Sequence, residues 1–220
     1  MTVQTAASVG LRERKKERTR QALIDAAYEL FDRNGFDATT VEEIAAAVEV
    51  SPRTFFRYFA SKEDVALTLQ DDLKSAIVGE LAARPADEPV MTAIRRAFQA
   101  VARVLQDEEE TSLPGKECGL SQRFACFNDL VTSSPSLFAA SLEHTTKKQD
   151  DIVALIADRM GADPVTDLRP HLATAAAVCA ARAALETWKR AGGGAKSMPD
   201  GLDHAFSLLE ESLNYPAAPR

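Results

Sequence analysis

The side chains best suited to binding chemistry lie in the segment S-P-R-T-F-F-R-Y-F, which begins at Ser51. Ser51 is a good helix N-cap, and Pro52 fits the first position of a helix. We expect Phe55 and Phe59, one turn apart, to face inward. Four polar side chains then stay largely outside: Arg53, Thr54, Arg57 and Tyr58. This set suits base edges and phosphates, although an ordinary polar surface on a helical hairpin would show the same pattern.

A second short helix is predicted just before this segment. Thr40 is a good N-cap, and Glu43 three residues later completes a capping box. Apolar residues then follow at helical spacing: Val41, Ile44, Ala45 and Val48. Two helices this short cannot bury their own apolar faces. Residues 39–62 therefore predict a helix-turn-helix that packs on another element.

A run of basic residues precedes the two short helices. Residues 11–20 contain six basic and two acidic side chains, a local net charge of +4, although the whole chain carries −7. An amphipathic helix follows from Leu23 to Phe31, and Asn34-Gly35 predicts its end. A basic arm, one longer helix and a helix-turn-helix together predict a compact DNA-binding module.

Residues 12–65 resemble the N-terminal domain of the TetR family of bacterial transcriptional regulators. The resemblance rests on the runs A-A-Y-E-L-F-D-R-N-G-F-D-A-T-T-V-E-E-I-A and S-P-R-T-F-F-R-Y-F-A-S-K-E-D-V, about a quarter of the chain. It implies a homodimer that binds double-stranded DNA at an approximately palindromic operator. It also implies a small-molecule effector that releases the protein, usually a repressor, from its operator.

The expected DNA contacts divide by their chemistry. The full set is Thr40, Ser51, Pro52, Arg53, Thr54, Arg57, Tyr58, Lys62, Arg12 and Arg14. Arg53 and Arg57 are the expected base readers. Thr40, Tyr58 and Lys62 are the expected phosphate contacts.

Two positions depart from the family pattern. Glu49 stands at a turn position that is usually glycine, and a positive φ there would cost about 1 kcal/mol. Phe56 stands where the family often has a tyrosine that contacts phosphate. The hydroxyl contact is therefore expected to be absent.

The remaining chain is predicted to be helical throughout, since no strand-like alternation or repeat is visible. The expected helices cover residues 62–81, 93–105, 120–131, 138–161, 167–191 and 199–213, with a loop at 107–119. The fold class is therefore all-α, a three-helix DNA-binding domain followed by a bundle of about six helices. The expected divisions are a flexible N-terminus (1–10), the helix-turn-helix domain (11–61), the ligand-binding and dimerisation domain (62–215) and a loose tail (216–220). The alanine-dense helix at 167–191 and the final helix are expected to form the dimer interface.

The second domain offers apolar and aromatic side chains for an effector pocket between helices. The candidates are Phe98, Val101, Phe124, Phe127, Phe138 and Trp188. Each could equally be plain core. The S-P-R-T-F-F-R-Y-F segment and the placing of Trp188 are similar to a subgroup proposed to bind acyl-CoA-like ligands, so an apolar or acyl-type effector is expected.

Catalytic and metal-binding motifs are missing from the sequence. It contains no phosphate-binding glycine loop, no G-x-S-x-G and no H-E-x-x-H. Its histidines and cysteines lack metal-like spacing: His144, His171, His204, Cys118, Cys126 and Cys179. We expect no enzyme activity, cofactor or metal. The alternatives are a helical interaction protein with an unused helix-turn-helix and, from another class, a helical enzyme.

Composition places the chain among ordinary globular proteins, with 45% hydrophobic and 27% charged residues. No apolar run approaches the ~18 residues that span a bilayer. The first ten residues lack the basic and apolar blocks of a signal peptide. A cytoplasmic location is therefore expected.

Overall fold

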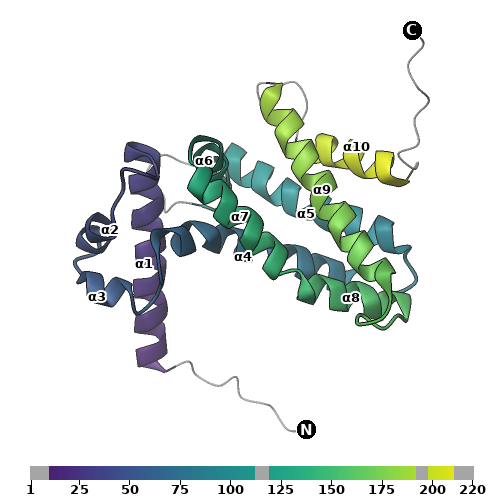
Figure 1. Cartoon of the computed structure of the whole chain (residues 1–220), viewed down its shortest axis with the longest axis horizontal. Coiled ribbons are helices and arrows are strands. Elements are labelled where there is room, and N and C mark those ends of the chain that lie inside the picture. The colour runs from purple at the N-terminus through teal and green to yellow at the C-terminus, as the bar shows by residue number, and fades with distance from the viewer. Residues whose placement is uncertain (1–9, 112–118, 192–197, 211–220) are drawn as a thin grey trace. The chain divides into compact units, whose positions relative to one another are not determined.

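The structure of the chain, a computed structural model, describes residues 10–111, 119–191 and 198–210. These described residues form helices and turns without a strand, which confirms the all-α prediction (Figure 1). In chain order the helices are α1 (Leu11–Asn34), α2 (Val41–Ala47), α3 (Pro52–Phe55), α4 (Lys62–Ala83), α5 (Val90–Thr111), α6 (Leu120–Ser133), α7 (Pro135–Lys147), α8 (Asp150–Met160), α9 (Leu168–Arg190) and α10 (Met198–Glu210).

The chain divides into two compact units. Unit 1 comprises residues 1–69 and 113–142, and unit 2 comprises residues 70–112 and 143–220. Two of the three boundaries, 69/70 and 142/143, pass through a helix, because α4 and α7 each contribute residues to both units. Unit 1 therefore contains α6 and the first part of α7 together with α1, α2 and α3. The functional division at residue 61 stays a prediction.

Helix α1 includes the basic residues that the sequence suggested would form an arm. That expectation was wrong, because α1 begins at Leu11. Arginine, lysine and glutamate are good helix formers. Two pairs at i,i+3 support the first turns, Lys16–Glu13 at 3.6 Å and Arg20–Glu17 at 3.7 Å. The predicted end is confirmed, since α1 stops at Asn34 before Gly35, which has φ +82°.

The predicted caps of the helix-turn-helix are confirmed. The hydroxyl of Thr40 accepts a hydrogen bond from the Glu43 N–H at 3.2 Å, and the Glu43 carboxylate accepts one from the Thr40 N–H at 2.8 Å. The hydroxyl of Ser51 accepts from the Thr54 N–H at 3.1 Å. Ser61 caps α4 in the same way, since its hydroxyl accepts from the Asp64 N–H. These local signals fix where the short helices begin.

The turn after α2 contains the strained residue that the sequence suggested. Glu49 has φ +55° and is the one non-glycine residue with a positive φ among the residues described here. Its N–H donates to the Ala46 carbonyl, and the Val50 N–H donates to the Ala45 carbonyl, both at 3.0 Å. This is a Schellman motif, which glycine usually completes.

Unit 1 is centred on one face of α1. The residues of α1 buried there are Leu23, Ile24, Ala27, Tyr28 and Phe31. The hydroxyl of Tyr28 donates to the Ala66 carbonyl of α4 at 2.7 Å. The guanidinium of Arg123, on α6, lies 6.0 Å from the centre of the Tyr28 ring. Ser134, just before α7, donates to Asp37 at 2.9 Å. Helix α6 and the start of α7 thus pack on the N-terminal helices.

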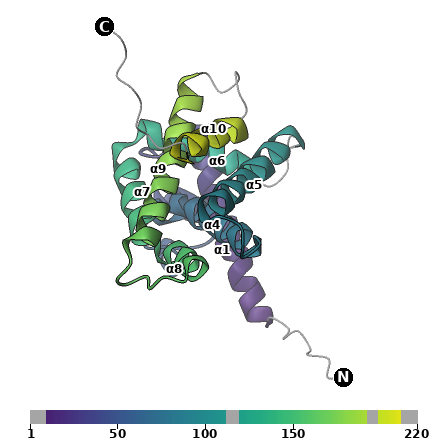
Figure 2. The same cartoon turned by 90° about the vertical axis from the view of Figure 1, so that its right-hand side faces the viewer.

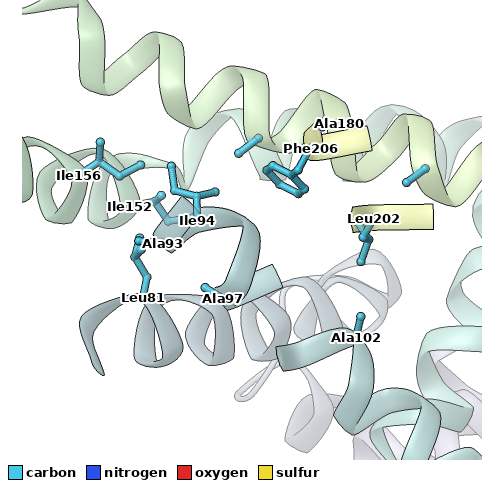
Figure 3. Close-up of a cluster of buried hydrophobic side chains, with 12 residues drawn as sticks. Leu81, Ala93, Ile94, Ala97, Ala102, Ile152, Ile156, Ala180, Leu202 and Phe206 are labelled. Atoms are coloured by element: carbon cyan, nitrogen blue, oxygen red, sulfur yellow. The ribbon is translucent and has the colours of Figure 1, made fainter. Parts of the chain in front are cut away.

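Unit 2 has its own apolar core. Figure 3 shows how Leu81 of α4, Ile94 of α5, and Ile152 and Ile156 of α8 gather on one side of it. Helices α9 and α10 pack side by side (Figures 1 and 2). Alanines of α9 are buried in this core, as its composition suggested: Ala177, Ala180 and Ala184. Small side chains let neighbouring helices approach closely.

Three further expectations need correction. Helix α5 continues through the acidic residues to Thr111, because glutamate favours helix and no glycine or proline interrupts it. The apolar pattern at 138–161 forms two helices, α7 and α8. The basic end of α7, at Lys147, and the acidic start of α8, at Asp150, suit the dipoles of separate helices. Seven helices, α4 to α10, therefore follow the first three in the described chain, instead of about six.

Some expectations fall outside the described residues. They concern the N-terminal residues 1–9, Cys118, the glycines 192–194, the end of the last helix after Glu210, and the tail. In the part of the chain that is described, no helix is long and apolar enough to cross a membrane.

Replacing Glu49 by glycine should stabilise the protein. Glycine adopts a positive φ without the steric cost that a β-carbon brings, so Glu49→Gly should raise the free energy of unfolding by about 0.5–1 kcal/mol. Urea unfolding measures this difference. Glu49→Ala is the matched control, because it removes the charge and keeps the β-carbon. Equal stability of the glycine and alanine variants would contradict the strain at this turn.

Candidate functional site

The segment from Ser51 to Phe59, called the recognition segment below, has the buried and exposed faces that the sequence predicted. Phe55 is fully buried and Phe59 is 6% exposed. Arg53 and Arg57 are exposed, and Thr54 and Tyr58 are partly exposed. The helical hydrogen bonds continue beyond α3, since the Phe59 N–H donates to the Phe55 carbonyl at 3.1 Å. One turn thus buries two rings and presents polar side chains on the opposite side.

The two arginines of this face differ in their surroundings. The guanidinium of Arg57 lies over the Tyr58 ring, 5.1 Å from its centre, and donates to the Tyr58 hydroxyl at 3.2 Å. Arg57 and Tyr58 therefore form one pair on the surface, which presents a positive charge and a phenol. Arg53 lies one turn earlier on the same exposed face. A guanidinium so placed can donate two parallel hydrogen bonds to guanine.

The hydroxyl groups of Thr40 and Ser51 already serve as caps. The Thr40 hydroxyl also donates to the Glu43 carboxylate at 2.8 Å. The backbone and side-chain hydrogen bonds from Thr40 lower the pKa of Glu43, so this carboxylate stays ionised at neutral pH. Both hydroxyls are exposed, and Pro52 is exposed beside Ser51. Helix starts of this kind present N–H groups and hydroxyls that can contact phosphate.

Lys62 has a different environment from the one expected for a phosphate contact. Its ammonium donates to three backbone carbonyls, those of Phe36 at 2.7 Å, Thr39 at 2.9 Å and Asp37 at 3.2 Å. It also lies 4.6 Å from the centre of the Phe36 ring. An ammonium has three N–H groups, and all three are engaged. A phosphate contact would require Lys62 to give up one of these carbonyls, so the geometry favours a structural role.

The other basic candidates lie on α1. Arg12 and Arg14 are exposed in its first turns, in the same helical run as Lys15, Lys16 and Arg18. Farther along α1, the guanidinium of Arg20 lies 5.4 Å from the centre of the Phe59 ring. Arg20 thus links the basic run of α1 to the recognition segment through a cation–π contact.

Sequence reasoning missed the most prominent apolar side chain of this face. Phe56 is 55% exposed, although it follows the buried Phe55 directly. Its exposure could have been found from the helical period, because a residue next to a buried position points about 100° away. In the sequence, Phe56 stood out only for the hydroxyl that it lacks.

A small apolar cavity lies within unit 2. Its lining comes from α4, α5, α8 and α9: Ile77, Leu81, Ile94, Phe98, Ile152, Ile156, Thr174, Ala177 and Val178. The space inside it that a water-sized sphere can occupy is about 10 Å³, roughly enough for one water molecule. Ligand pockets usually hold roughly 300–1,000 Å³, so a drug-sized molecule needs this cavity to widen.

The six expected pocket residues do not gather around this cavity. Phe98 lines it, whereas Val101 is buried on α5 elsewhere in the core. Trp188 is partly buried, and its indole Nε1 meets no acceptor among the described residues. The other three belong to unit 1: Phe124 and Phe127 of α6, and Phe138 of α7. The lining is mainly aliphatic, whereas five of the six expected residues are aromatic.

Within residues 10–111, 119–191 and 198–210, no three histidine, cysteine, aspartate or glutamate side chains come together as a metal site would require.

Lys62→Met should weaken the fold and leave the electrostatics of DNA binding nearly unchanged. The variant keeps the apolar stem and loses three hydrogen bonds, so we expect unfolding to become easier by about 1–3 kcal/mol. The slope of log affinity against log salt concentration for duplex DNA should stay the same. Arg12→Ala is the comparison, and a lost phosphate contact there should reduce the slope by about 0.9. A reduced slope and unchanged stability in Lys62→Met would instead make Lys62 a phosphate contact.

Comparisons with known proteins agree with this geometry. The family model described as "Bacterial regulatory proteins, tetR family" matches residues 23–69, and the model described as "MftR C-terminal domain" matches residues 88–214. The chain is 40% identical over 179 residues to the HTH-type transcriptional regulator TcmR of Streptomyces glaucescens. The aligned residues cover 81% of this chain and 76% of that protein.

Solved structures share the fold. Thermus thermophilus FadR, a TetR-family repressor in complex with lauroyl-CoA, has a TM-score of 0.53 and 23% identity, over 91% of this chain and 98% of that one. SmeT in complex with triclosan has a TM-score of 0.54 and 16% identity, over 92% and 98%. Together with the helix-turn-helix and its exposed arginines, the two family matches and the 40% identical regulator show that this chain belongs to the TetR family of DNA-binding transcriptional regulators, a family of regulators and not of enzymes.

Proposed function

We propose that this chain is a homodimeric repressor that leaves its operator when a small apolar molecule enters the second unit. The observation that carries the DNA-binding part is the recognition segment, where Arg53 and Arg57 are exposed directly opposite the buried Phe55 and Phe59. Binding to chromosomal DNA implies a cytoplasmic location.

The roles proposed for the DNA contacts follow the geometry. Arg53 reads a base, and Arg57 acts together with Tyr58 at the edge of the groove. Backbone contacts come from the two helix starts, at Thr40 and at Ser51 to Thr54, and from the basic run of α1, including Arg12 and Arg14. Lys62 stabilises the module through its hydrogen bonds to backbone carbonyls between α1 and α2. Base contacts specify the sequence, and phosphate contacts set the position of the protein on DNA.

Arg53→Ala should relax sequence preference at one position of each half-site. A bidentate guanine contact contributes roughly 1–3 kcal/mol of discrimination. The measurement is the affinity for a panel of operator duplexes with single base-pair changes. Arg12→Ala is the control and should weaken binding to all sequences alike.

Two results would contradict the DNA-binding proposal. Identical specificity profiles for Arg53→Ala and wild type would remove Arg53 from base readout. Salt-independent binding, or none, by the wild type would favour the interaction protein with an unused helix-turn-helix.

The proposed dimer uses the outer face of α9. Small and apolar residues recur along its exposed side at helical spacing: Leu168, Leu172, Ala175 and Cys179. Leu168 and Leu172 are 73% and 63% exposed. An exposed apolar stripe of this length is costly in water and suits a second copy of the same helix. Ala180 faces the core of its own unit, so the stripe and not the buried alanines would form the interface.

Ala175→Glu should yield a monomer that binds the operator weakly. In the centre of an isologous interface, each carboxylate lies near the same carboxylate of the second copy and loses its hydration. Sedimentation at micromolar protein concentration measures the change. Ala154→Glu, which places the same charge on an exposed alanine of α8, is the matched control and should remain dimeric. A monomeric wild type, or a dimeric Ala175→Glu variant, would contradict the proposed interface.

The effector is proposed to occupy and widen the unit 2 cavity. The lining is almost entirely apolar, which favours an acyl chain or a small aromatic molecule over a sugar or an ion. Proteins of similar fold bind lauroyl-CoA and triclosan. Ile77 and Leu81, which line the cavity, belong to α4, and the same helix begins at Lys62 in unit 1. A ligand that prefers one position of α4 can thus change the DNA-binding unit, and a 100-fold preference corresponds to about 2.7 kcal/mol.

Ala177→Leu should blunt release from DNA by filling the cavity. Ala177 lines it and is 3% exposed, so the larger side chain must occupy the space proposed for the effector. The assay is displacement of operator DNA by fatty acyl-CoAs and small aromatic compounds. Ala181→Leu, at a partly buried position of α9 outside the lining, is the matched control. Unchanged release of Ala177→Leu by a compound that releases the wild type would place the effector elsewhere.

A further inference from the structure

Phe56 combines exposure with a fixed position. Its side chain is 55% exposed, the highest fraction for an aromatic residue in the part of the chain that is described. Its N–H donates to the Pro52 carbonyl at 3.0 Å, which keeps it in the helical turn of the recognition segment. Its ring meets the buried Phe55 ring edge-on, with centres 5.5 Å apart and planes at 86°. The ring is therefore supported from below and presented outward.

The neighbours of Phe56 show what it would meet. Arg53 is three residues earlier, so its side chain and the Phe56 ring are neighbours on the exposed surface, and the exposed Arg57 is the next residue. Arg57 lies against Tyr58 and not against Phe56. An isolated exposed phenylalanine carries no information by itself. Here it stands among the side chains that face DNA, where an apolar group needs an apolar target.

We propose that Phe56 is a specificity-determining residue that reads the C5-methyl group of one thymine in each half-site. A phenyl ring has no donor or acceptor, so it cannot bind a phosphate or a base edge by hydrogen bonds. The apolar group that base pairs present in the major groove is the thymine methyl. Phe56 and Arg53 would then read neighbouring positions, one by shape and one by hydrogen bonds. This inference rests on the DNA-binding function of the same segment.

The experiment removes only the methyl group. Duplexes selected from randomised DNA by the wild-type protein provide the operator, and each thymine is replaced in turn by deoxyuridine. Burial of one methyl group suggests a roughly three- to fivefold loss of wild-type affinity at one position per half-site. Phe56→Ala should bind more weakly and show no further loss at that position. Phe56→Leu, which keeps an apolar side chain, should retain part of the sensitivity.

Phe138→Ala is the matched control, because Phe138 is an exposed phenylalanine on α7, outside the recognition segment. It should keep the full wild-type sensitivity to deoxyuridine. The same sensitivity in Phe56→Ala and wild type at every position, with both proteins folded by thermal melting, would overturn the proposal and leave DNA binding intact. Failure of the wild type to select any duplex would overturn the DNA-binding function itself, together with this inference.

Discussion

The arrangement of the DNA-binding helices in unit 1 depends on the hydrogen bonds that the ammonium group of Lys62 donates. This group lies among the carbonyls of Phe36, Asp37 and Thr39, in the connection between α1 and α2, and it belongs to the first residue of α4. Backbone carbonyls in a connection otherwise need water or another donor. One charged side chain therefore joins the start of α4 to the connection between α1 and α2. In the sequence, the recognition segment lies between this connection and Lys62.

A hydrogen bond from a second side chain reinforces this arrangement. The hydroxyl of Tyr28, on α1, donates to the Ala66 carbonyl, one turn beyond Lys62 on α4. The start of α4 is thus held at two points, whereas its later residues contribute to unit 2. There, Lys74 pairs with Asp151 at 2.8 Å, and Asp71 pairs with Lys148 at 2.8 Å. A helix held firmly in one unit and paired in the other is suited to transmit a change in packing, which is the basis of the proposed induction.

The sequence predicted the features that depend on neighbouring residues. The capping box of Thr40 and Glu43, the Ser51 cap and the stop after Asn34 all arise within four residues, so local chemistry determines them. The positive φ of Glu49 was expected from the family resemblance, because this turn position is usually glycine in the family. The inward position of Phe55 and Phe59 followed from the helical period.

Features that depend on distant residues could not be predicted in this way. The partners of Lys62 lie 23 to 26 residues earlier in the chain, so nothing near Lys62 indicates its structural role. The packing of Arg123 against Tyr28 joins helices whose sequence patterns show only that each has an apolar face. The cavity is lined mainly by aliphatic side chains from four helices, and Phe98 is the one of the six expected pocket residues that lines it.

A hydroxyl-radical footprint of the wild-type protein on DNA beside its own gene tests the central claim most directly. A dimer that presents two recognition segments should protect two half-sites related by two-fold symmetry, with centres about 34–36 Å, one helical turn, apart. Protection should disappear when an effector is added. A single protected patch, uniform protection along the duplex, or no protection at all would contradict a symmetric, sequence-reading dimer.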